Sequence, residues 1–383
     1  MPAFTPPRCL SGEAQQADRW CRRLAPVVAD CRLLLLLAGT ETAAVPGISA
    51  AGATPESRRR TAAADAELLL LGPSRPLPHA LPPLPAGVSP ALIARVVVEQ
   101  LALEPLVIDL GVPVPPAVPH LTLGHTPARC ISSGSAMAPE RVAELLALGD
   151  SWGAALARQR APVLLAECVP GGTSTAQAVL QGLGVAAAGR VSGSLRQPVH
   201  GLKAALVERG LTAAGLAAPA PAAAVLAAVG DPMQAVAAGL VRTAAAAGLP
   251  LLLAGGSQMA AVLALALDLS APEDRPLLLE QAAIATTAWV AADAGSDLQG
   301  LLALIGRRWG GLPLAFAAAL RFGSCRSPEL RAYEQGFVKE GVGAGGLALL
   351  WQLSGRSPLA LAEACDQACV ALRLAVTAPE GPA

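Results

Sequence analysis

The sequence predicts an α/β protein with an open, mostly parallel sheet flanked by helices, and a small helical layer formed by the N- and C-terminal segments. Two observations predict this class. Short uninterrupted apolar runs, such as residues 33–37 and 106–110, are typical of parallel strands that are covered on both faces. These runs alternate with longer Ala- and Leu-rich segments that read as helices, and such alternation favours a parallel sheet.

The elements are expected in the following order. The apolar runs predict strands at 33–37, 68–71, 106–110, 162–166, 225–229, 250–254 and 284–290. The Ala/Leu-rich segments predict helices at 89–103, 138–158, 175–183, 197–209, 233–247, 259–267 and 347–352. Residues 1–30 and 357–377 are expected to be helical and to lie outside the sheet. We therefore expect one domain over 1–383, with a core at about 31–352 and stiff Pro-rich loops at 73–90 and 112–119.

The composition excludes several classes of protein. The formal net charge is zero, and one Tyr and four Phe leave few rings for stacking on bases, so nucleic-acid binding is not expected. The uncharged stretch 243–267 is interrupted by a Gly-Leu-Pro and a Gly-Gly sequence, which favours a soluble, cytoplasmic protein over a membrane span. Eight scattered Cys without a Cys-x-x-Cys pair predict reduced thiols, with neither a metal site nor a cofactor.

Two acidic, Gly-rich segments are the most informative motifs. In the first, Glu167 follows a predicted strand, and Gly171, Gly172, Thr173 and Ser174 form a turn before a predicted helix. Backbone N–H groups at a helix N-terminus, together with hydroxyl groups, can hold a phosphate. The alternative is an ordinary turn with a Ser or Thr cap, and this motif alone does not exclude it.

The second segment places Glu340 beside Gly341 and Gly343 and ahead of another apolar helix. So many glycines in so few positions indicate that the backbone approaches a ligand closely. A carboxylate at such a turn can act as a base for a substrate that is anchored nearby. The alternative is a Glu on the protein surface.

Weaker signals repeat the same theme. Lys203 is a candidate counter-charge for a phosphate, although single helical lysines are usually solvated. Gly230, Gly255 and Gly256 each follow a predicted strand, and ordinary helix capping is the alternative for all three.

Glu41 and Thr42 follow the run 33–37, so we expect them at the carboxyl end of a buried strand, level with both Gly-rich turns. A carboxylate buried there needs a partner. The partner is either an Arg or Lys of the same chain or an N–H edge of a bound base.

Taken together, these motifs resemble the nicotinate-nucleotide:dimethylbenzimidazole phosphoribosyltransferases of cobalamin assembly. The family pattern is approximately GEMGIGNTT, then GxGxG with a later RK, GG, DGF and GEGSGA. The segment 39–56 is similar to a cyanobacterial and archaeal branch related to those enzymes. The resemblance covers about 33–352.

The resemblance implies transfer of phosphoribose from nicotinate mononucleotide to an azole or purine base, without a cofactor, giving an α-riboside 5′-phosphate and nicotinate. In this reading Glu340 matches the family's base and Glu167 its other acidic residue. Gly172 stands where the family has Asn, and Lys339 where it has Gly. Because of these differences the resemblance does not identify the acceptor base. A non-catalytic nucleotide-binding or regulatory protein and a nucleotide hydrolase are the alternatives. We also expect a homodimer.

Overall fold

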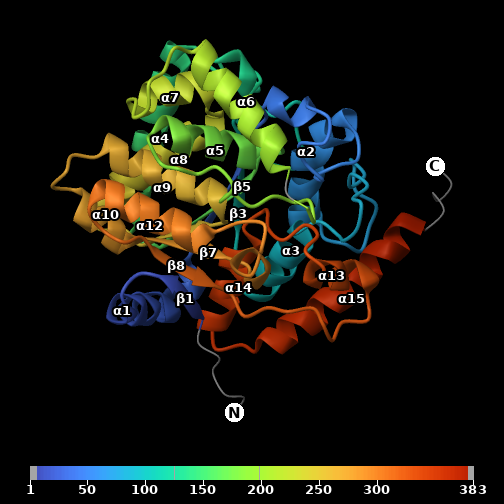
Figure 1. Cartoon of the computed structure of the whole chain (residues 1–383). Coiled ribbons are helices and arrows are strands. Elements are labelled where there is room, and N and C mark those ends of the chain that lie inside the picture. Colours follow the sequence, from blue (N-terminus) through green and yellow to red (C-terminus); the bar gives the residue numbers. More distant parts are fainter. Residues whose placement is uncertain (1–6, 125, 198, 378–383) are drawn as a thin grey trace.

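The computed structural model describes residues 7–124, 126–197 and 199–377. These residues form an eight-stranded sheet in the order β1-β8-β7-β6-β5-β2-β3-β4 (Figure 1). All neighbouring strands are parallel except β1 and β8. The predicted fold class is therefore confirmed. The strands are β1 (Arg8–Ser11), β2 (Arg32–Leu37), β3 (Pro105–Asp109), β4 (Leu121–Thr122), β5 (Val163–Cys168), β6 (Leu251–Ala254), β7 (Ala282–Thr286) and β8 (Leu314–Ala317).

The central strand β2 shows why uninterrupted apolar runs predicted the sheet. Five consecutive leucines follow Arg32, and each is almost completely buried because β2 pairs with β5 on one side and β3 on the other. Leu35, for example, lies opposite both Val107 and Ala166. Neither face of such a strand meets water, so no polar alternation is needed.

Helices cover both faces of the sheet (Figure 1). One face packs against α4, α5, α8, α9 and α12, and the other against α1, α2, α3, α14 and α15. Their bounds, with those of the remaining helices, are α1 (Ala14–Leu24), α2 (Pro55–Leu71), α3 (Ala91–Gln100), α4 (Pro139–Gln159), α5 (Gly172–Gly182), α6 (His200–Ala213), α7 (Ala222–Val229), α8 (Pro232–Ala246), α9 (Ser257–Leu269), α10 (Arg275–Gln281), α11 (Ala288–Ala291), α12 (Leu298–Trp309), α13 (Pro328–Glu334), α14 (Ala344–Leu353) and α15 (Pro358–Thr377). Three short 3₁₀ segments are η1 (Ala25–Asp30), η2 (Glu41–Ala44) and η3 (Ile131–Ser133).

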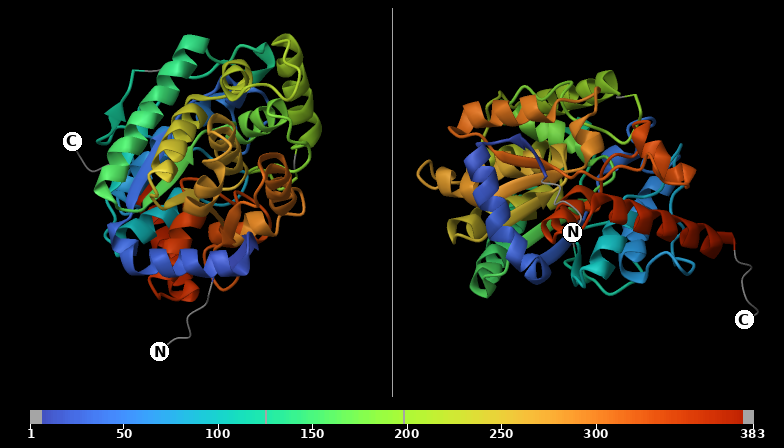
Figure 2. Two further views of the ribbon diagram at one scale, coloured as in Figure 1. Left: turned by 90° about the vertical axis from the view of Figure 1, so that its left-hand side faces the viewer. Right: turned by 90° about the horizontal axis from the view of Figure 1, so that it is seen from below.

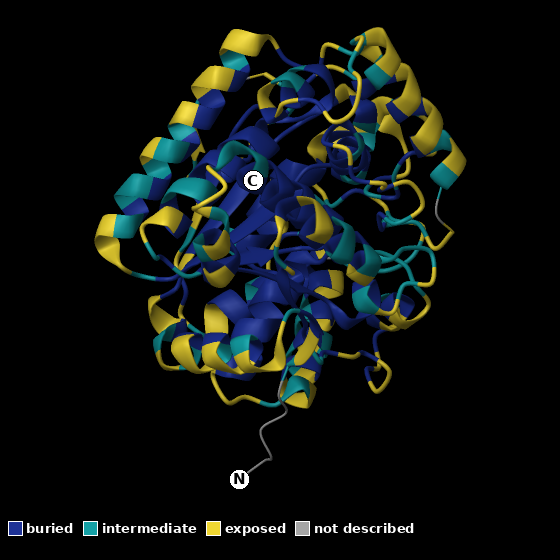
Figure 3. Ribbon diagram, turned by 60° about the vertical axis from the view of Figure 1, so that its left-hand side comes forward, coloured by how far each residue is buried: buried dark blue, intermediate teal, exposed yellow. Residues whose placement is uncertain are grey.

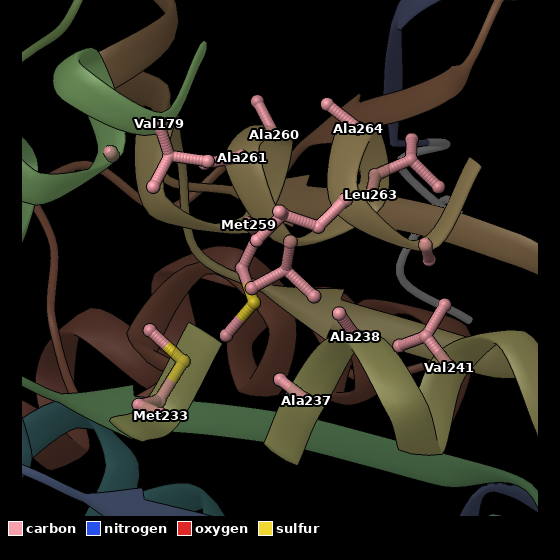
Figure 4. Close-up of a cluster of buried hydrophobic side chains, with 14 of the residues drawn as sticks. Val179, Met233, Ala237, Ala238, Val241, Met259, Ala260, Ala261, Leu263 and Ala264 are labelled. Carbon is pink, nitrogen blue, oxygen red and sulfur yellow. The ribbon is translucent and has the colours of Figure 1, made fainter. Parts of the chain in front are cut away.

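Small residues allow neighbouring helices to pack closely: a Cβ on Gly149 of α4 would stand 2.2 Å from the carbonyl oxygen of Val236 on α8. In Figure 4, Met259 of α9 extends toward Ala237 and Ala238 of α8, whereas Ala260 and Ala264 lie on the opposite side of α9. The buried colour runs through the strands and the inner helix faces in Figure 3, while the outer helix faces are exposed. Among the described residues, no helix is both long and apolar enough to cross a bilayer.

Two predicted strands are wrong. Residues 68–71 form the last turn of α2, which begins at a capping box between Thr54 and Ser57, and residues 225–229 belong to α7. Both runs are mostly buried and contain no polar residue, so their periodicity does not distinguish a strand from a helix. The run 284–290 divides between β7 and α11. The sequence analysis missed β1, β4 and β8, which are only two to four residues long.

The terminal segments differ from each other. At the N-terminal side, β1 extends the sheet antiparallel to β8, so this part is not wholly helical, and α1 follows it. The predicted C-terminal helix is confirmed as α15, which packs against α3, α13 and α14. Its last turns reach beyond the body of the molecule (Figure 2).

Candidate functional site

A cavity lies where the strand order reverses, between β2 and β5. The chain proceeds from β2 to β3 on one side, and from β5 through β6 and β7 to β8 on the other. Open parallel sheets bind ligands beyond the carboxyl ends of the strands at such a point. The cavity measures about 330 Å³, a size suited to a small molecule. Its walls come from residues 48–51, 81–90, 167–173, 192–194, 256–258 and 337–341, together with residues 61, 65 and 290.

The first acidic residue, Glu167, stands near the end of β5 and lines the cavity. Its Oε2 accepts the N–H of Val169 at 2.9 Å, and its Oε1 accepts Nε2 of Gln258 at 2.9 Å. Burial, followed by the nearby carboxyls of Asp231 and Glu340, raises the pKa of Glu167 to about 8. At neutral pH this carboxyl therefore holds a proton and can donate a hydrogen bond.

The carboxyl of the second acidic residue, Glu340, accepts more hydrogen bonds than that of Glu167. Its Oε2 accepts the Thr286 hydroxyl at 3.0 Å and the Thr287 N–H at 2.9 Å. Its Oε1 accepts the N–H groups of Gly341 at 3.1 Å and Gly345 at 3.0 Å. Burial raises the pKa of Glu340, and these four bonds oppose the rise.

The two acidic segments lie directly side by side, because the N–H of Val342 donates to the carbonyl of Glu167 at 3.1 Å. Two donors hold the Glu167 carboxyl and four hold that of Glu340. Hydrogen bonds to a carboxylate favour its charged form. We therefore assign the proton of this pair to Glu167 and the negative charge to Glu340.

The glycines after Glu340 have two different roles. Gly341 lines the cavity, as a ligand-facing glycine would. Gly343, Gly345 and Gly346 instead allow α14 to touch the sheet: a Cβ on Gly345 would stand 2.2 Å from the carbonyl carbon of Thr286. The glycine density therefore reflects helix–sheet packing more than approach to a ligand.

The backbone of the same segment is strained. Val338, Lys339 and Val342 adopt φ values of 64°, 69° and 52°, a region that branched side chains rarely enter. Strained backbone persists only where its surroundings hold it, and it gathers at functional sites. This strain is a second, independent indication that the loop around Glu340 is functional.

Some backbone N–H groups of the turn after Glu167 already donate hydrogen bonds within the turn. The N–H of Gly172 donates to Val169 at 2.8 Å and that of Ser174 to Gly171 at 2.9 Å. Ser174 is buried behind the cavity wall, and its hydroxyl has no partner among the described residues. A phosphate at this turn would therefore meet Gly171 and Thr173, while Gly172 and Ser174 shape the turn.

Replacement of Gly172 by Val tests this turn. A Cβ there would stand 2.0 Å from Oε1 of Gln258, so the amide must leave its bond with Glu167. We expect Gly172→Val to weaken nicotinate mononucleotide binding about tenfold, roughly the free energy of one hydrogen bond to a charged group, with unchanged circular dichroism. Gln258→Ala should reproduce the loss, and Gly323→Ala, in open space, should bind normally. Unchanged binding by Gly172→Val would place the ligand away from this turn.

Lys203 lies immediately behind the cavity wall. Its Nζ donates to Oγ1 of Thr173 at 2.8 Å and to the carbonyl of Ser192 at 3.1 Å. A Cβ on Gly193 would stand 3.3 Å from Nζ. Burial, followed by the charge of Lys339, lowers the pKa of Lys203 to about 8, although Asp293 opposes the shift. The predicted counter-charge for an anion is therefore beside the cavity.

Lys339 supplies a second ammonium group, which the sequence analysis did not place in the site. Its Nζ donates to Oδ2 of Asp293 at 2.9 Å, and the residue lines the cavity. Lys203 and Lys339 are the two lysines of the sequence. The sequence has 26 arginines, so a position that keeps a lysine stands out. This difference is the signal from which both lysines could have been predicted as site residues. Lys203, Lys339 and Asp293 carry a local net charge of +1, which suits an anion, while the charged Glu340 lines another part of the same cavity.

Seven predicted residues do not line the cavity: Ser174, Lys203 and Gly343, described above, and Glu41, Thr42, Gly230 and Gly255. Glu41 is exposed, so the expectation of a buried carboxylate there is wrong: η2 turns its side chain outward. Thr42 is buried, but its hydroxyl accepts the N–H of Ile131 and so joins two loops. Gly230 caps the C-terminus of α7 instead of following a strand. Gly255 continues the β6–β7 pairing by donating to Ala285, and its neighbour Gly256 lines the cavity.

The segment that contains Glu41 is nevertheless well ordered. The guanidinium of Arg58, buried on α2, donates to the carbonyls of Ala43, Val45 and Gly52. This fixes residues 48–51 as a wall of the cavity. The Pro-rich loop forms another wall, held by the buried carboxylate of Glu67, which accepts both the ring Nδ1 and the backbone N–H of His79.

The chain is similar in sequence to known proteins over most of its length. The chain is 52% identical to the UPF0284 protein of Parasynechococcus marenigrum, with 97% of this chain and 94% of that protein covered. It is 47% identical to the UPF0284 protein of Gloeobacter violaceus, with 92% of this chain and 91% of that protein covered. The chain belongs to the UPF0284 family.

Residues 91–274 of this UPF0284 member also match a family model described as phosphoribosyltransferase. Its fold is similar to that of nicotinate-nucleotide-dimethylbenzimidazole phosphoribosyltransferase from Thermus thermophilus, with a TM-score of 0.57 and 18% identity. The match covers 94% of this chain and 92% of that enzyme. The UPF0284 chain therefore has the fold of that enzyme over almost its whole length.

Proposed function

We propose that the protein transfers a phosphoribosyl group from nicotinate mononucleotide to a ring nitrogen of a benzimidazole- or purine-like base, releasing nicotinate, in the assembly of a cobamide lower ligand. The observation that supports this most directly is that Glu167 and Glu340 line one cavity, with two hydrogen-bond donors on the first carboxyl and four on the second. The phosphoribosyltransferase family match and the fold likeness agree with it.

The anion end of the cavity suits the 5′-phosphate. Lys203, Thr173 and the N-terminus of α5 meet there, and helix N-termini attract phosphate. Lys339 adds positive charge on the side of Glu340. These groups would fix the ribose so that its C1′ faces the remaining space of the cavity.

The reaction then needs one base. A ring nitrogen of the acceptor attacks C1′, the bond from C1′ to the pyridinium nitrogen breaks, and its electron pair stays on that nitrogen and neutralises it, so that nicotinate leaves as an anion. The other ring nitrogen loses its proton to Glu340, which must release one of its four hydrogen-bond donors to accept it. This is the one proton that the protein must take up. Glu167, in its protonated form, would donate a hydrogen bond to a ribose hydroxyl.

Product analysis tests the proposal. The protein is incubated with nicotinate mononucleotide and a panel of adenine, benzimidazole and dimethylbenzimidazole, and the products are separated by liquid chromatography. We expect an α-riboside 5′-phosphate and an equal amount of nicotinate. Free ribose 5-phosphate would identify a hydrolase instead. Binding without any product would identify a non-catalytic nucleotide-binding protein.

Lys203 makes nucleotide affinity depend on pH. Its pKa is lowered to about 8, so the ammonium loses its proton near that pH, and phosphate attraction is present below pH 8 and lost above it. We expect the Kd for nicotinate mononucleotide to rise up to about tenfold between pH 7 and 9, the most that loss of one proton with this pKa can cause over that range. Titration calorimetry measures this. Lys203→Met should bind weakly at both pH values, and a steep dependence that survives in this variant would assign it to another group.

The same low pKa affects folding. An unfolded lysine keeps its proton to about pH 10.5, so between pH 8 and 10.5 the unfolded chain binds more protons than the folded one. Burial of Lys203 therefore costs stability below pH 8, and that cost is relieved as the pH rises through this window.

We also propose a homodimer. The outer side of α15 exposes Leu359, Val370 and Val376, which are 55%, 44% and 75% exposed. Light scattering should give twice the mass of one chain, and a monomer at micromolar concentration would contradict this.

A further inference from the structure

The cavity holds a third buried carboxyl, Asp65, which the proposed reaction does not use. Asp65 lies in the middle of α2, is 4% exposed and lines the cavity. Its Oδ1 accepts the Ser89 hydroxyl at 2.6 Å, and its Oδ2 lies 3.4 Å from the Cys168 thiol. Both partners are neutral donors.

This carboxyl has no cation within ion-pairing distance among the described residues. A buried carboxyl normally needs a paired charge or a full set of donors, and two neutral donors leave lone pairs unused. Burial raises the pKa of Asp65 to about 6, which reflects the missing counter-charge. A polar group with spare acceptor capacity that faces a cavity is a candidate for ligand recognition.

The position of Asp65 relates it to both acidic segments. Its contact Cys168 is the neighbour of Glu167 in β5. Its other contact, Ser89, precedes Pro90, and a Cβ on Gly341 would stand 3.2 Å from the ring of Pro90. Asp65 therefore contacts the neighbour of Glu167 directly, while the loop of Glu340 lies close to the residue that follows its other partner, Ser89.

We propose that Asp65 recognises the acceptor, accepting a hydrogen bond from an exocyclic amino group of the base whose ring N–H is held by Glu340. Asp65 thereby takes the role in base recognition that was one of the two alternatives for Glu41 in the sequence. The preferred substrate class is an aminated heterocycle, such as a 6-aminopurine. A base that lacks the amino group leaves the carboxyl of Asp65 without that donor in a site closed to water.

The inference rests on the proposed function for the identity of the acceptor, so its test is binding instead of turnover. Adenine and purine, which differ by one amino group, are titrated into the full-length protein in a calorimeter, with and without nicotinate. The wild type should bind adenine at least tenfold more tightly than purine. Asp65→Leu, which removes both acceptor oxygens, should lose most of this difference and keep its purine affinity within about threefold, whereas Asp65→Asn, which keeps one carbonyl oxygen, should lose less of it.

Each outcome separates the two proposals. If adenine is bound in an Asp65-dependent manner but no riboside phosphate forms, the proposed reaction fails and the recognition role stands. If the wild type binds purine as tightly as adenine, the recognition role is overturned. Equal losses of both bases in Asp65→Leu would show that Asp65 merely holds Ser89 at the start of α3. Ser89→Ala, which removes that hydroxyl but keeps the carboxyl, should preserve the preference for adenine.

Discussion

Replacement of Glu340 by glutamine should lower kcat about 10²- to 10⁴-fold, the usual contribution of a general base. The amide keeps the size of the side chain but cannot take the azole proton. Affinity for nicotinate mononucleotide should change little, because the substitution leaves the proposed phosphate site at Lys203 and the α5 turn intact. Steady-state kinetics with a saturating base, together with calorimetry for the nucleotide, measure both quantities.

Two matched variants make this test specific. Glu41→Gln changes an exposed carboxylate outside the cavity and should turn over normally. Glu167→Gln should cost less than Glu340→Gln at pH 7, because the carboxyl of Glu167, with a pKa of about 8, is already protonated there. If Glu167→Gln lowers kcat more than Glu340→Gln does, Glu167 is the base and Glu340 the protonated carboxyl. If Glu340→Gln keeps the wild-type kcat, Glu340 has no part in the mechanism.

Replacement of Gly149 by alanine should destabilise the fold by about 3 kcal/mol, the upper part of the range for overpacking a core. A Cβ on Gly149 of α4 would stand 2.2 Å from the carbonyl oxygen of Val236 on α8, and one on Gly239 would stand 2.4 Å from that of Leu146. The two helices meet backbone to backbone, so no side-chain rotation relieves the clash. The midpoint of urea unfolding measures the loss.

Gly201 provides the control, because it lies in α6 with nothing within 4 Å of its Cβ position. Gly201→Ala should stabilise the protein by about 0.5–1 kcal/mol, since alanine restricts the unfolded chain more than glycine does. If Gly149→Ala also stabilises, α4 and α8 are further apart than the structure places them.

The sequence predicted strands well where an apolar run was short and bounded by Gly, Pro or a charge, as at β2, β3, β5 and β6. It failed at residues 68–71 and 225–229 because these mostly buried helical runs contain no polar residue. It missed β8 because four residues with two alanines are too few to show a pattern. The absence of a polar face thus removes the signal that separates helix from strand.

The acidic residues of the site were predictable because each stands in a local motif, Glu167 before one turn and Glu340 before another. Asp65 was not, since it lies inside an Ala-rich helix with no motif around it. Its relation to Cys168 spans 103 residues and exists only after α2 packs on β5. Glu41 was misplaced for a related reason: position after a strand fixes the backbone and leaves the side-chain direction to the following turn.

The burial of both lysines has a consequence for the chemistry of the outer surface. Every other basic side chain except histidine is an arginine, so apart from the α-amino group the exterior offers no primary amine. Acylating reagents and amine-directed cross-linkers would find their side-chain targets only at the cavity. Slow labelling of Lys203 and Lys339, and its suppression by a bound anion, would therefore report on occupancy of the cavity without any engineered probe.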